Sequence, residues 1–105
     1  MAKYVEPRDL TISGLSFKLT CPEYPEQYDV FSEDGRQVGY VRLRFGYLYA
    51  SYLDCDGETV YFSEDFAGDG SFFKDKERIF HLSKIAEAIK HRMSEKARQA
   101  AALAP

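Results

Sequence analysis

Two histidines are the first residues whose chemistry invites attention. His81 and His91 lie ten residues apart in a segment with helical periodicity. That separation is about 15 Å along a helix, too far for both side chains to bind one metal ion. Each histidine follows a glutamate by four residues, Glu77 and Glu87, as in ordinary pairs on a helix surface. We therefore expect surface roles for both histidines and predict no catalytic residue.

Carboxylates between residues 54 and 69 are the second such group. Oxygen ligands suit Ca²⁺ or Mg²⁺, but the run "DCDGE" lacks the other ligands of a calcium loop, and a tight hairpin turn explains it better. Two further interpretations stay open: a mimic of nucleic-acid phosphates, and a solvated loop. The sequence predicts no metal and no cofactor. It predicts one acidic cluster at one end of a sheet, formed by Asp54, Asp56, Glu58, Glu64, Asp65 and Asp69.

Motifs of known catalytic mechanisms do not occur. The chain has no G-x-S-x-G, P-loop, H-E-x-x-H or C-x-x-C sequence. Its two cysteines, Cys21 and Cys55, show no metal-ligand spacing and are expected to be reduced thiols. The first residues contain no apolar signal core, and no run approaches the roughly 20 apolar residues of a membrane span. We expect a non-enzymatic cytoplasmic protein.

Tight turns and hydrophobic periodicity define the elements that must position any site. Asp34-Gly35 and Asp56-Gly57 fit type I′ turns, and Gly46-Tyr47 fits a type II′ turn. The alternating segments between them predict an antiparallel meander over 28–63, with a further short strand at 15–19. Apolar residues recur every three or four positions from Ile79 to Met93, which predicts a helix over 75–98.

The predicted fold class is therefore α+β. We expect one domain over 1–105, with an antiparallel meander of four to five strands and one C-terminal helix packed on one face. Residues 1–27 are expected to form an N-terminal arm that includes the short strand. The net charge of −3 divides unevenly, because residues 1–72 carry −7 and residues 73–105 carry +4. Such a split can steer a charged partner or hold the helix to the sheet.

Pairing across the turns sorts the meander into two faces. Gly46-Tyr47 as a two-residue loop sets Phe45 opposite Leu48, and the face that contains Val41 and Leu43 is predicted to receive the helix. The other face combines aromatic side chains with arginines, residue types enriched at interfaces. A register slip of one residue would exchange the two faces. The partner-binding residues predicted from this second face are Tyr40, Arg42, Arg44, Tyr49, Leu53 and Phe62.

Three explanations compete for the second face. The N-terminal 27 residues cover it, a second copy of the chain pairs through it as a homodimer, or a different macromolecule docks there. A protein is the expected macromolecule. Nucleic acid is the alternative, because tyrosines and arginines suit base stacking and phosphate contact while the −7 charge opposes a polyanion. A membrane is not expected as a partner.

Residues 28–89 resemble small uncharacterised proteins carried by phages, plasmids and bacteria. The similarity lies in a strand, a "DG" turn, the run "GYVRLR", another strand, an acidic "GDGSF" loop and a short helix. In build and charge, the chain also resembles anti-CRISPR inhibitors. That resemblance implies a protein-binding inhibitor of a host defence complex that acts by steric occlusion, in the host cytoplasm if a phage encodes it. It implies no catalytic residues.

Overall fold

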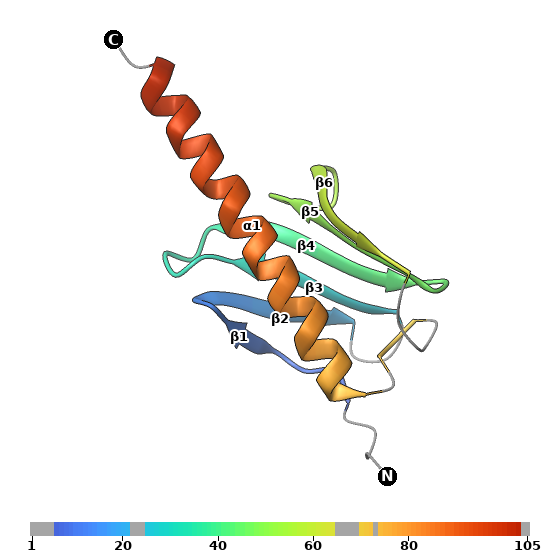
Figure 1. Ribbon diagram of the computed structural model, residues 1–105. Helices are drawn as coiled ribbons and strands as arrows, with labels where there is room; N and C mark the ends of the chain where they lie inside the picture. Colours follow the sequence, from blue (N-terminus) through green and yellow to red (C-terminus); the bar gives the residue numbers. More distant parts are fainter. Residues whose placement is uncertain (1–5, 22–24, 65–69, 73, 104–105) are drawn as a thin grey trace.

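One six-stranded antiparallel sheet and one long helix make up the computed structural model (Figure 1). The structure describes residues 6–21, 25–64, 70–72 and 74–103. The strands follow one another across the sheet in chain order, so the sheet is a simple meander. Its elements are β1 (Leu10–Ile12), β2 (Leu15–Cys21), β3 (Glu26–Phe31), β4 (Gln37–Arg44), β5 (Tyr47–Tyr52), β6 (Glu58–Ser63) and α1 (Asp75–Leu103).

The α+β meander predicted from the sequence is confirmed, with six strands in place of four or five. The predicted strand at 15–19 is β2, and the additional strand β1 precedes it. In the plane of the sheet, β2 pairs with β3, and β1 pairs with β2 and forms the edge. The hypothesis that the N-terminal residues cover the second face is therefore wrong for residues 10–21, because they form β1 and β2 at the sheet edge instead.

Alternation along the strands places one apolar face beneath α1. Val41, Leu43 and Leu48 are fully buried, together with Leu82 and Ile85 of the helix. Burial of each such side chain contributes about 1.5–3 kcal/mol, so this layer supplies the main stabilisation of the fold. The predicted assignment of the two faces is confirmed.

The turn between β4 and β5 differs from the predicted one by one residue. Phe45 and Gly46 form the two-residue loop, both with positive φ (55° and 76°), and Arg44 pairs with Tyr47. This is the type I′ pattern, whose twist matches that of the flanking strands. The change moves the pairing by two residues, so Leu43 lies opposite Leu48 and the faces are kept. Phe45 leaves the core face and is 65% exposed.

The sheet curves around the helix. Lys90 donates a hydrogen bond to the carbonyl of Ser13, beside β1, at 3.0 Å, while Arg92 forms an ion pair with Glu58 at the start of β6. These helix residues are two positions apart, yet they reach opposite edges of a sheet that would be roughly 24 Å wide if flat. The face under α1 is therefore concave, and the opposite face is convex.

Helix α1 continues beyond the sheet and beyond the predicted end at residue 98. Its last buried side chain is Ile89, and Met93 is the last apolar one packed against the core. Figure 1 shows the orange-red end of the helix extending past the strands. Residues 96–103 are exposed.

Candidate functional site

The convex face of the sheet is the candidate site. The described part of the chain has one helix, which packs on the concave face, so no described element covers the convex one. We call this surface the open face. Register and burial assign to it Ser16, Lys18, Gln27, Asp29, Tyr40, Arg42, Arg44, Tyr47, Tyr49 and Phe62.

Aromatic side chains form a continuous strip over β4, β5 and β6. The rings of Tyr47 and Phe62 stack with centroids 5.8 Å apart, and those of Tyr40 and Tyr49 lie 6.3 Å apart at a tilt. Tyr47, the first residue of β5, and Phe62, on the edge strand β6, are 49% and 59% exposed, so two large aromatic side chains stack in contact with solvent. Such a patch is typical of an interaction site.

Tyr40 is held in place within this strip. Its hydroxyl donates a hydrogen bond to the side-chain oxygen of Gln27 on β3. Partial burial is the main cause of a raised pKa for the Tyr40 phenol, with the neighbouring Tyr49 adding to it. The ring is therefore neutral and oriented at ordinary pH, so it offers a fixed surface.

Two arginines alternate along β4 beside these rings. In the register, Arg42 lies opposite Tyr49 and Arg44 opposite Tyr47. The guanidinium of Arg44 lies 4.6 Å from the centre of the Phe45 ring. Within the described ranges neither arginine forms an ion pair, whereas Arg8, Arg36, Arg78 and Arg92 all do. The Nε atom of Arg42 is buried and lacks a hydrogen-bond acceptor among the described residues.

The structure brings five of the six predicted partner-binding residues onto one face: Tyr40, Arg42, Arg44, Tyr49 and Phe62. Leu53 is the exception. It follows the end of β5 with a positive φ of 82°, and its N–H donates to the carbonyl of Val38. Tyr47, which the sequence assigned to a turn, belongs to the face because the turn lies one residue earlier.

The predicted acidic cluster is divided. Asp54 and Asp56 lie in the turn before β6 and Glu58 begins that strand, whereas Glu64 follows its other end. Six residues of strand separate the two groups by about 20 Å. Asp65 and Asp69 are outside the described residues. Carboxylates of the described chain therefore border both ends of the sheet and do not form one cluster.

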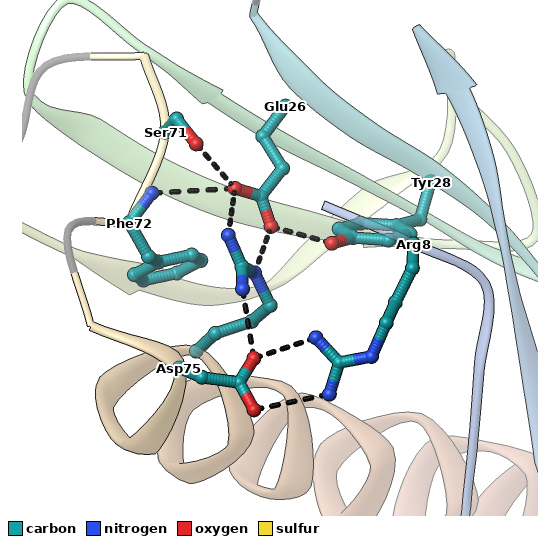
Figure 2. Close-up of polar contacts among 7 residues, drawn as sticks. Arg8, Glu26, Tyr28, Ser71, Phe72 and Asp75 are labelled. Carbon is teal, nitrogen blue, oxygen red and sulfur yellow. Dashed lines mark hydrogen bonds and ion pairs between the residues drawn. The ribbon is translucent and has the colours of Figure 1, made fainter. Parts of the chain in front are cut away.

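A buried polar network at the start of α1 was not predicted from the sequence (Figure 2). Glu26 and Arg78 are both fully buried and joined by hydrogen bonds of 2.7 and 3.2 Å. Glu26 also accepts from the hydroxyls of Tyr28 and Ser71 and from the N–H of Phe72. Every oxygen of the buried carboxylate thus has donors, as a buried charge requires.

A second carboxylate extends this network to the N-terminal segment. Asp75 accepts hydrogen bonds from Arg78 at 2.7 Å and from both terminal nitrogens of Arg8 at 2.8 and 3.0 Å. The Arg8 contact is the main cause that lowers the pKa of Asp75 from 3.8 to about 2. Burial opposes the charge of Arg78, but its contacts with Glu26 outweigh burial and raise its pKa. The network joins three chain segments and is structural in character.

The two histidines have different surroundings. His91 is exposed and pairs with Glu95, as expected for a surface residue. The predicted surface role of His81 is wrong, because this residue is buried, with its Nδ1 2.9 Å from the Tyr61 hydroxyl and its ring stacked on Phe72. Among the described residues, no group of three or more His, Cys, Asp or Glu side chains is arranged to hold a metal ion.

Comparisons with known proteins found no family model, no curated protein and no solved structure that matches this chain. Within the described residues, no helix combines the length and apolar character of a membrane span.

Proposed function

We propose that this chain is a non-enzymatic binding protein whose open face docks against another protein. The observation that carries the proposal is the strip of exposed aromatic rings around two arginines that form no ion pair with a described carboxylate. Tyrosine, phenylalanine and arginine are enriched in the centres of protein interfaces. Neither the hydrophobic core nor the buried network of Glu26 and Arg78 uses these side chains.

Curvature favours a different protein over a second copy of the chain. Two convex sheets touch over a small central area, whereas stable interfaces bury about 800 Å² on each partner with close shape complementarity. A concave or flexible partner surface can follow the open face over its full width. Light scattering is expected to give the mass of a monomer.

Charge distribution favours a protein over nucleic acid. The carboxylates of Asp54, Asp56 and Glu64 border the two ends of the sheet, where a long polyanion would pass. Nucleic acid stays the second candidate for one specific reason. Most described carboxylates between residues 6 and 64 lie outside the strands, and Glu26 is buried. The charged side chains of the open face are therefore Lys18, Arg42 and Arg44 with a single carboxylate, Asp29.

Resemblance to phage-borne inhibitors places nuclease complexes of host defence first among the partners to be tested. An inhibitor of this kind would occlude the nuclease sterically. Adding the chain to a purified CRISPR nuclease would then reduce DNA cleavage, and the variant Tyr47→Ser/Phe62→Ser would restore it.

A photo-crosslinking amino acid at position 47 tests the proposal more generally. We expect it to capture a partner that the same amino acid at position 96, on the exposed helix end, does not capture. The captured protein is then purified and its affinity measured directly. Tyr47→Ser/Phe62→Ser should weaken binding at least about tenfold, as loss of central aromatic contacts does, while Lys96→Ser should not. Equal affinity of wild type, Tyr47→Ser/Phe62→Ser and Lys96→Ser for the captured protein would contradict the proposal.

A further inference from the structure

We infer that Arg42 and Arg44 bind two carboxylates of an extended acidic segment in the protein partner, with the acidic residues two positions apart. The inference rests on the proposed function and specifies the chemistry of the partner at the same face. Three features of the open face support it: the spacing of the arginines, their lack of partners, and the surface around them.

Spacing is the first feature. Residues two apart in a strand project from the same face and are separated by about 6.6 Å. An extended segment lying along β4 has the same repeat, so acidic residues at alternate positions fall opposite Arg42 and Arg44. Adjacent acidic residues would point to opposite sides of that segment, and only one would reach the face.

Unmet hydrogen-bonding capacity is the second feature. The buried Nε of Arg42 has no acceptor within the described part of the chain, and a buried donor without an acceptor costs about 1–3 kcal/mol. Carboxylates accept two parallel hydrogen bonds from a guanidinium, from Nε and a terminal nitrogen or from both terminal nitrogens. Because the Nε atom is itself buried, a carboxylate of a partner would reach the terminal nitrogens of Arg42, for which no acceptor is found within the described part of the chain.

The surroundings are the third feature. Arg42, Arg44, Phe45, Tyr47 and Tyr49 together line a shallow depression on the open face. The rings on its sides reduce the access of water to an ion pair, which strengthens the attraction between the charges. A short acidic segment fits between the carboxylates that border the sheet, whereas a continuous phosphate backbone would approach them.

Two ten-residue peptides of identical composition test the inference by NMR titration of the full chain. One carries glutamates at alternate positions, and the other carries the same glutamates in adjacent pairs. We expect the alternating peptide to bind about tenfold more tightly, to shift the resonances of Arg42 and Arg44, and to lose this advantage in Arg42→Gln/Arg44→Gln. Arg42→Lys/Arg44→Lys should retain part of the affinity, because lysine keeps the charge without the bidentate geometry.

Equal affinity for the two peptides would overturn the inference, as would tighter binding of a ten-nucleotide oligothymidine than of either peptide. The purified partner separates this inference from the proposed function. If Tyr47→Ser/Phe62→Ser abolishes partner binding and Arg42→Gln/Arg44→Gln does not, the carboxylate assignment fails and the proposed function stands. If neither variant weakens binding, both fail. The amide spectrum of each variant establishes that it is folded.

Discussion

At the residue scale, the buried pair of Glu26 and Arg78 is the feature with the largest consequence. The two side chains come from β3 and α1 and are 52 positions apart in the chain. Bringing two charges out of water is costly, and the cost is offset here by donors from Tyr28, Ser71 and Phe72. Such a pair adds little net stability, but it penalises any arrangement in which one partner is missing.

Removing one partner should therefore destabilise the fold strongly. We expect Arg78→Met to lower the free energy of unfolding by about 3–5 kcal/mol, because Glu26 would stay buried without its partner. The double variant Glu26→Leu/Arg78→Met should cost less than the sum of the single variants. Urea denaturation of the two single variants and the double variant, each compared with wild type, measures these free energies of unfolding. Arg36→Met, whose ion pair is exposed, serves as the control and should change the midpoint little.

Asp75 should make part of the stability sensitive to acid. Its pKa is about 2 in the folded chain against an ordinary value of 3.8, so the folded state holds the proton less tightly. The resulting stabilisation is complete above pH 3.8 and is lost as pH falls through 2. We expect wild type to exceed Asp75→Asn in urea midpoint at pH 6, with the gap closing between pH 4 and pH 2. A gap independent of pH would contradict this assignment.

At the scale of elements, one glycine sets how closely the helix approaches the sheet. A Cβ atom on Gly39 of β4 would lie 2.5 Å from Cδ1 of Ile89 and 3.3 Å from Cβ of Val30. Real Cβ atoms do not approach other atoms so closely, so a side chain at position 39 would require the end of the Ile89 side chain to shift. The position has ordinary φ, and the constraint is therefore one of packing.

A double-mutant cycle tests this contact. We expect Gly39→Ala to destabilise by about 1–3 kcal/mol through overpacking, and Ile89→Val by about 0.5–1.5 kcal/mol through lost burial. Because Ile89→Val removes the atom that clashes, the double variant should be more stable than the sum of the two changes predicts. Thermal or urea unfolding provides the values. Simple additivity would show that the helix moves away instead.

The end of α1 should behave differently from its packed part. Residues 96–103 contact no core side chain, so their helical structure depends on propensity and on continuation from the packed turns. We expect their amide hydrogens to exchange much faster than those of residues 82–89. Arg98→Gly should reduce helix content by circular dichroism without shifting the urea midpoint, while Ala86→Gly should lower the midpoint.

At the scale of the whole molecule, one face of the sheet forms the hydrophobic core with α1, and the side chains of the other face do not contribute to that core. The concave face carries the apolar core, and the convex face carries exposed rings and two arginines that form no ion pair among the residues the structure describes. A protein that folded for stability alone would place polar side chains there.

This division predicts opposite effects of substitutions on the two faces. Tyr47→Ser and Phe62→Ser should each change the free energy of unfolding by less than about 1 kcal/mol and raise solubility, because the side chains are already half exposed or more. Leu48→Ala, next to Tyr47 in the chain but fully buried, should cost about 2–5 kcal/mol. Similar costs on both faces would show that the open face is part of the fold's own core.

Sequence reasoning alone determined the meander, the helix and the assignment of side chains to two faces. These features follow from local signals: the period of two along strands, the period near 3.6 in α1, and glycine in tight turns. The predicted turn at Gly46-Tyr47 lies one residue earlier in the structure. This changes the pairing of β4 with β5 by two positions, so each side chain keeps its predicted face except at the turn.

Only the tertiary structure decided which distant residues meet. Pairing of β1 and β2 with the sheet edge left the open face uncovered, and β6 carried Glu58 and Glu64 to opposite ends. Glu26 contacts Arg78 because α1 packs on the sheet with its first turns beside the start of β3. No spacing of residues in the sequence predicts such contacts, because they depend on how whole elements pack and not on the conformation of neighbouring residues.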